Sequence, residues 1–208
     1  MSVRQRTRAP EVTRRRILDA AFQEFHRNGF QAARVDAILE RAGVTKGALY
    51  HHFPDKTRLG YAVLEEIIHE PLLEAYIADL RDEHTDPLDA LQAVLRRRAD
   101  DFESGGIELG CPLNNLTQEM SPLDEGFRAR MAVTLDAWTD AFAEAIERGQ
   151  RTGRIRVDMD ARAVAHLLVA AIEGSFGMAK NARSVELLRS NLTTLAGFLD
   201  TLRQRRAA

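Results

Sequence analysis

The stretch Arg41–Lys56, RAGVTKGALYHHFPDK, decides how the amino-terminal part of this chain folds. Gly43 supplies the backbone angles of a tight turn, and Thr45 is a suitable N-cap for the short helix that follows. Pro54 stops that helix after Phe53, because proline lacks the N–H that would continue it. Helix, tight turn and helix is the arrangement that places its second helix in the major groove of DNA.

The sequence before this stretch supplies the rest of a small three-helix unit. From residue 13 onward apolar residues recur at helical spacing as far as Phe25, and Asn28 with Gly29 ends this helix. A second short helix fits residues 35–42. Residues 1–12 contain three arginines without apolar periodicity, which predicts a mobile basic arm.

Beyond residue 56 the chain is predicted to be helical throughout, because no alternating strand pattern occurs. A fourth helix begins near Asp55 and is kinked or ended by Pro71. Further helices are predicted over residues 86–104, 112–120, 122–151, 161–181 and 185–203. The result is an all-α fold of about nine helices. The triplet Arg96–Arg98 is predicted to lie on a solvated helix face.

The composition is that of an ordinary globular protein. Of the 208 residues, 45% are apolar and 29% are charged, which suits one or two domains with a sizeable core. No apolar run of about 18 residues and no signal-peptide pattern occurs. The single cysteine, Cys111, excludes an internal disulfide. These features predict a soluble protein of the cytoplasm without a membrane partner.

The charges are unevenly divided along the chain. Residues 1–56 contain 11 Lys and Arg against 6 Asp and Glu, whereas the remaining 152 residues contain 18 against 25. A basic amino-terminal quarter on an acidic body favours contact of one end with a polyanion, although charge also clusters without such a role.

Residues 13–60 resemble the amino-terminal region of the tetracycline-repressor (TetR) family of bacterial transcription regulators. The resemblance rests on TRRRILDAAFQEFHRNGF and AGVTKGALYHHFPDKTRLG, in which the turn, the capped helix and the following Pro-Asp-Lys have the family's order and spacing. The segment GCPLNNLTQEM, residues 110–120, is similar to one in a subset of the family that includes electrophile-sensing members. Beyond residue 60 the resemblance is one of helix number and chain length.

This resemblance implies a homodimer with an N-terminal arm and DNA-binding domain at residues 1–56. Residues 57–208 would form a larger domain that binds a small-molecule effector and dimerises. Members of the family mostly repress genes and release a palindromic operator when the effector binds. The family often has Ser or Thr at the start of the second helix, whereas this chain has Ala33 and Arg34, so the usual helix cap is expected to be missing. No cofactor and no enzymatic activity is expected.

The side chains predicted to face DNA lie on or beside the third helix. Lys46 can donate to guanine O6 or N7, while Gly47 and Ala48 permit close approach. The predicted DNA-binding residues are Arg34, Thr45, Lys46, Gly47, Ala48, Tyr50, His51, His52 and Lys56. A metal site at the histidine pair is not expected, because adjacent helical side chains point about 100° apart.

Cys111 directly precedes Pro112, at the expected N-cap of a helix, where backbone N–H groups favour a thiolate. It is therefore either a sensor of electrophiles or oxidants, or a small buried apolar residue. The predicted effector-binding residues are Phe102, Cys111, Leu113, Asn114, Gln118, Trp138, Phe142 and Glu173.

The last two helices are apolar around more of their circumference than one core requires, which is typical of self-association. The residues predicted to form the dimer interface are Leu167, Leu168, Ala171, Ile172, Phe176, Leu188, Leu192, Leu195 and Leu199. Two alternatives to a ligand-released repressor stay open. One is a DNA-binding protein without a ligand, and the other, with weaker sequence support, is an enzyme that uses Cys111 as nucleophile.

Overall fold

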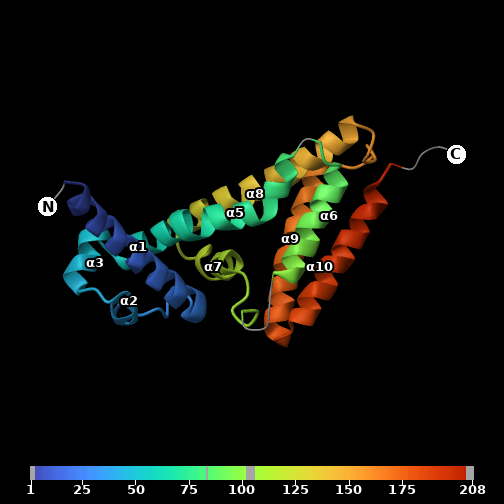
Figure 1. The fold of residues 1–208 in the computed structure, drawn as a ribbon. Helices are drawn as coiled ribbons and strands as arrows, with labels where there is room; N and C mark the ends of the chain where they lie inside the picture. Colours follow the sequence, from blue (N-terminus) through green and yellow to red (C-terminus); the bar gives the residue numbers. More distant parts are fainter. Residues whose placement is uncertain (1–2, 83, 102–105, 205–208) are drawn as a thin grey trace. The chain divides into compact units, whose positions relative to one another are not determined.

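A computed structural model describes residues 3–82, 84–101 and 106–204, with side chains from residue 10 onward. The chain packs into two compact units, residues 1–70 with 112–131 and residues 71–111 with 132–208. Both units are helical (Figure 1), and within the described ranges the only β-pairing is a single bridge between Ile155 and Arg203.

The first unit consists of the amino-terminal helices and a segment from the middle of the chain. It contains α1 (Val3–Asn28), α2 (Val35–Ala42), α3 (Lys46–His52), α4 (Lys56–Val63), the π-helical segment η1 (Leu64–His69) and α7 (Pro112–Met120). The long helix α8 (Glu125–Arg151) begins in this unit and continues into the second. The first unit therefore reaches beyond the predicted boundary at residue 56, because it includes α7 and the start of α8.

The second unit contains the remaining helices. They are α5 (Glu70–Ile77), the 3-10 turn η2 (Ala78–Arg81), α6 (Pro87–Asp100), α9 (Ala161–Ala182), α10 (Val185–Leu199) and the 3-10 turn η3 (Asp200–Leu202). With α4, η1 and α5 taken as one interrupted helix, the residues that the structure describes form nine α-helices. The prediction of an all-α fold is thus confirmed.

The turn and caps around α3 form as their sequence predicts. Gly43 adopts a left-handed φ of 61° and its N–H donates to the Glu40 carbonyl, which ends α2. The Thr45 hydroxyl accepts from the N–H of Ala48 at 3.2 Å, which caps α3. The Asp55 carboxylate accepts from the N–H of Arg58 at 2.7 Å and caps α4 in the same way.

The core of the three amino-terminal helices is closely packed. Ile17 and Phe25 from α1 are buried together with Ile38 from α2 and Leu49 from α3. Because α3 is held by its buried Leu49, the opposite face of this short helix is left to the solvent.

The prediction of a mobile basic arm over residues 1–12, before a helix that starts at residue 13, is wrong from Val3 onward, where the chain is already helical. Helix α1 begins at Val3 and passes through Pro10. Arg and Gln are good helix formers, and extending an existing helix is easier than starting one, so no apolar periodicity is needed. Pro10 removes one backbone hydrogen bond but does not end the helix.

The predicted interruption near Pro71 takes the form of a change in helix type. Residues Leu64–His69 are π-helical, and α5 follows with Pro71 as its second residue. A π-helical turn widens the helix locally and is common at functional positions. One of the sequence boundaries between the two compact units falls between Glu70 and Pro71, directly after this segment.

In the second unit α10 packs along both α6 and α9 (Figure 1). A buried amide joins two of these helices, since the Gln92 side chain of α6 donates to the Ala196 carbonyl of α10 at 2.8 Å. Helix α9 is long and apolar enough to cross a membrane by length and composition, contrary to the absence of such a run predicted above. A single helix of this kind is also typical of a protein core, and the buried face of α9 supplies Leu168, Ile172 and Phe176 to the core of this unit.

Candidate nucleic-acid interface and buried polar cluster

The exposed face of α3 carries the side chains predicted to read DNA. Lys46 and Gly47 are exposed at its first turn, and Tyr50 is 39% exposed one turn later. The Lys46 ammonium lies 5.9 Å from the centre of the Tyr50 ring. A cation and an aromatic donor therefore stand together on the outer face, a combination suited to base edges and phosphates.

The start of α2 is held by an acidic side chain instead of a cap. Arg34 occupies the N-cap position without a side-chain cap, which confirms the expected departure from the family pattern. Its N–H donates to the carboxylate of Glu24, a buried residue of α1, at 3.1 Å. The Arg34 side chain is exposed and does not cap the helix, so the predicted contact with DNA is sterically open to it.

The two histidines at the end of α3 have different surroundings. His51 is exposed, whereas His52 is half-buried, with its ring 6.3 Å from that of Phe53. Desolvation, and then the nearby charges of His51 and Arg14, lower the pKa of His52. The imidazole of His52 is therefore harder to protonate than an ordinary histidine side chain.

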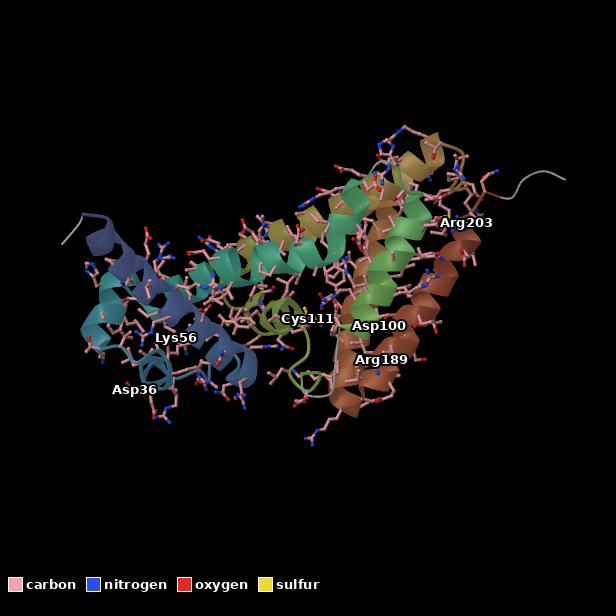
Figure 2. The ribbon with its side chains drawn as sticks, viewed as in Figure 1. Asp36, Lys56, Asp100, Cys111, Arg189 and Arg203 are labelled. Carbon is pink, nitrogen blue, oxygen red and sulfur yellow. The ribbon has the colours of Figure 1, made fainter. Side chains whose placement is uncertain are left out.

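Lys56 has a structural partner within the chain in addition to its predicted contact with DNA. Its ammonium donates to the Gln31 carbonyl at 3.0 Å and lies 5.0 Å from the centre of the Phe30 ring. Burial is the main cause that lowers the pKa of Lys56, while the charges of Glu119 and Glu24 act against it. Lys56, labelled in Figure 2, thus ties the start of α4 to the turn between α1 and α2.

A second polar site lies inside the second unit, around Cys111. This residue, labelled in Figure 2, directly precedes α7, and its thiol donates to Oε1 of Glu173 in α9 at 3.2 Å. Both residues are buried. Desolvation raises the pKa of Glu173 to about 7, and the hydrogen bond from Cys111 opposes that rise. A buried thiol thus lies beside a buried carboxyl group whose pKa is close to neutral pH.

Two aromatic rings and a guanidinium stand near this pair. Tyr76 of α5 is buried, with its ring centre 4.0 Å from that of Trp138 in α8. The guanidinium of Arg98 lies 5.1 Å from the centre of the Tyr76 ring. Burial raises the pKa of Tyr76, an effect that Arg98 opposes and that the charges of Cys111 and Glu173 reinforce. The buried polar cluster consists of Tyr76, Arg98, Cys111 and Glu173, with Trp138 beside it.

Two parts of the sequence match models of known families. Residues 17–63 match the bacterial regulatory proteins of the tetR family, and residues 87–192 match the C-terminal domain of LmrA/YxaF-like transcriptional regulators. The chain belongs to the TetR family.

Similar proteins that are described as transcriptional regulators agree with this family assignment. The transcriptional regulator AcuR of Cereibacter sphaeroides is 30% identical over 79% of this chain and 74% of its own length. The transcriptional repressor DhaR of a Mycobacterium species is 29% identical over 88% of this chain and 89% of its own. A TetR regulator structure from Chloroflexus aurantiacus superposes with a TM-score of 0.83 at 26% identity, over 96% of this chain and 100% of that one. This TetR-family chain is therefore a DNA-binding transcriptional regulator and not an enzyme.

The residues predicted to bind an effector are divided between the two units. Cys111, Trp138, Phe142 and Glu173 belong to the second unit, where all four are buried. Leu113, Asn114 and Gln118 belong to the first unit, as buried, half-buried and exposed residues of α7. Phe102 lies outside the described residues.

Sequence reasoning missed Tyr76 and Arg98, and it wrongly placed the whole arginine triplet on a solvated face. Arg96 is exposed, but Arg97 bonds Asp79 and the Ala75 carbonyl, and Arg98 is largely buried. The spacing along the helix could have predicted the burial of Arg98. It follows the buried Val94 and Leu95 by four and three residues, so it lies on the same helix face as they do.

Most of the predicted dimer residues are not on the surface of this TetR-family chain. Leu168, Ile172, Phe176, Leu188, Leu192 and Leu199 are buried within the second unit. Leu167 is 58% exposed, and Ala171 and Leu195 are half-buried. The prediction chose the wrong face, because the most apolar sides of α9 and α10 are buried within the second unit, where α10 packs on both α6 and α9. The exposed stripe, which we call the α9–α10 stripe, contains Leu167, Gly174, Gly177, Met178, Gly197 and Phe198.

Proposed function

We propose that this TetR-family regulator is a ligand-responsive repressor, which binds a palindromic operator as a homodimer and releases it when a small molecule binds. The observation that carries the proposal is the exposed face of α3, where Lys46 and Tyr50 stand clear of the core behind a capped first turn. The description of DhaR as a repressor supports the direction of control. A regulator of this kind works in the cytoplasm, where its DNA is.

The homodimer is supported by the α9–α10 stripe. Leu167, Met178 and Phe198 are each close to half exposed or more, and the positions of the stripe's glycines are open. Small residues allow two helices to approach closely, and the large apolar side chains gain by leaving water. A two-fold dimer also places two recognition helices for half-sites roughly 34–36 Å apart.

The ligand response is supported by the buried polar cluster. Aromatic rings with a few convergent polar groups are what small-molecule sites are made of. Glu173 has a pKa of about 7, so its charge at neutral pH depends on what lies beside it. In this proposal the effector binds among Tyr76, Trp138, Cys111 and Glu173, and its binding energy favours the form with low operator affinity.

Operator binding is tested by fluorescence anisotropy with duplexes from the DNA that flanks the gene. Substituting Lys46→Ala or Tyr50→Ala should weaken binding by about 10-fold or more, as expected for loss of a base or phosphate contact. The matched control Arg96→Ala removes an exposed cation from α6 and should leave affinity within about 2-fold of the wild type. Equal loss in the control would show that overall charge, and not α3, sets the affinity.

The ligand response is tested by thermal shift against a library that contains both thiol-reactive and inert small molecules. A compound that raises the melting temperature and lowers operator affinity identifies the effector class. Cys111→Ser then separates two modes, because a thiol-reactive effector loses its effect and a reversibly bound one keeps it. A library without any such compound would favour the alternative of a ligand-independent DNA-binding protein.

A further inference from the structure

The backbone of the turn between α1 and α2 forms hydrogen bonds with a side chain from a distant part of the sequence. The N–H groups of Phe30 and Gln31 each donate to one oxygen of the Glu119 carboxylate, both at 2.8 Å. Glu119 is the last residue but one of α7, 88 and 89 residues away along the chain. The Phe30 N–H is partly buried and needs an acceptor, the Gln31 N–H is exposed, and a carboxylate is a strong acceptor for both.

The surroundings of this contact leave little freedom. Gly29 has a left-handed φ of 77°, and a Cβ there would lie 3.0 Å from a Glu119 oxygen, so a larger residue would push the carboxylate away. The Phe30 ring is buried and packs edge-on against Phe127 of α8, with ring centres 4.6 Å apart. The turn is therefore fixed by polar contact on one side and by aromatic packing on the other.

The same turn controls the start of the next two helices. Gln31 accepts the hydrogen bond from Lys56 at the start of α4, and three residues after Gln31 the backbone of Arg34 begins α2. Helix α2 leads through Gly43 directly into α3. A displacement of the turn would consequently be passed to the helices that position the DNA-reading face.

Helix α7 is a short helix whose residues lie beside those of α1. Its residues Asn115, Leu116 and Glu119 line one small space with Phe22 and Phe25 of α1, and that space has a volume of only about 10 Å³. This leaves room for at most one water molecule. At its other end α7 begins at Pro112, which is bonded to Cys111 of the buried polar cluster. Two helical turns, about 10 Å, separate Pro112 from Glu119.

We propose that Glu119 is a positioning residue for operator binding: through its two hydrogen bonds it makes the position of the α1–α2 turn, and hence operator affinity, depend on the position of α7. This inference rests on the proposed function and names the route by which the effector site acts on the DNA-binding helices. This route through α7 is separate from the interrupted helix α4–η1–α5.

Thermodynamic linkage supplies a test that needs no effector. If α7 influences operator binding through Glu119, then operator binding must stabilise α7 by the same factor. Helix α7 carries none of the side chains predicted to face DNA, so slower amide exchange there cannot come from direct contact with bases. The probe is a duplex selected from a random-sequence library by the wild-type protein.

The measurement is hydrogen–deuterium exchange of peptides from α7 and α3, with and without the selected duplex. In the wild type we expect exchange in both helices to slow, in α7 by about 5-fold or more. In Glu119→Ala we expect α3 to remain protected while the change in α7 is lost, and operator affinity to fall by a similar factor. Glu119→Gln, which keeps one acceptor oxygen, should lie between the two and is read alone if the alanine variant does not fold. The control Glu65→Ala breaks the 2.7 Å contact with Arg130 in the same unit and should behave as the wild type.

The outcomes separate the inference from the function it rests on. If no duplex is bound by the wild type, the proposed function fails and the positioning role fails with it. If a duplex binds but α7 exchange does not change, or slows equally in Glu119→Ala, operator binding stands and the role of Glu119 is overturned. A loss of α7 protection confined to the Glu119 variants establishes it.

Discussion

Replacing Glu173 by glutamine should stabilise the protein at neutral pH and leave its stability almost unchanged in mild acid. Glu173 is 9% exposed, and its carboxyl group accepts a hydrogen bond from the Cys111 thiol. Glutamine has the same shape, and its carbonyl oxygen can accept the same bond, so Glu173→Gln chiefly removes the capacity to become charged. The difference between variant and wild type therefore measures what the buried charge costs.

The size of this stability difference and the pH range over which it develops follow from the shift in the pKa of Glu173. Burial raises the pKa of Glu173 from 4.5 to about 7, so between these two values the folded protein holds a proton that the unfolded chain has lost. Each pH unit across this window lowers the stability of the wild type by about 1.4 kcal/mol. Below pH 4.5 the proton-dependent contribution of Glu173 to folding stability is fully present, and above pH 7 it is lost. Summed over the window the penalty is about 3 kcal/mol, which Glu173→Gln should recover.

Urea unfolding at a series of pH values from 5 to 8 provides the assay, at fixed protein concentration. Trp138, the single tryptophan, is fully buried near the cluster and reports unfolding by fluorescence. The advantage of Glu173→Gln should grow steadily up to pH 7 and then level off. The control Glu144→Gln changes an exposed carboxylate of α8, and its difference from the wild type should be flat. An equally flat difference for Glu173→Gln would refute the argument that Glu173 carries a buried, proton-dependent charge.

Three further substitutions test the cap, the packing and the surface. Thr45→Ala removes the hydroxyl that accepts from Ala48, which should cost about 1 kcal/mol and lower the melting temperature by about 2–4 °C, whereas Thr45→Ser should not. Gly60→Ala places a Cβ within 2.5 Å of Phe127 and 2.6 Å of Phe30, so it should destabilise by about 1–3 kcal/mol in urea; an unchanged midpoint would contradict the close packing of this site. Leu167→Glu puts a charge on the α9–α10 stripe and should halve the mass seen in sedimentation without loss of helicity, and a dimer that persists would place the interface elsewhere.

The residues whose structural roles could be predicted from the sequence are those that interact with near neighbours along the chain. Thr45, Gly43 and Asp55 act on backbone groups within four residues, so their side-chain types and order were enough to predict the turn and both caps. The missing cap at Arg34 was foreseen for the same reason. The family resemblance at residues 13–60, which the matched family models confirm, depends on this run of short-range interactions.

The sequence by itself thus determined the helical fold, the turn and cap that begin α3 and the presence of a distinctive thiol at Cys111. Only the tertiary structure decided which side of α9 and α10 is buried, and only it brought Glu173 to Cys111 and Glu119 to the α1–α2 turn. These pairs are 62 and about 89 residues apart along the chain. Helical periodicity specifies that a face will be buried but not against what, because every apolar stripe fits several partners and packing selects among them.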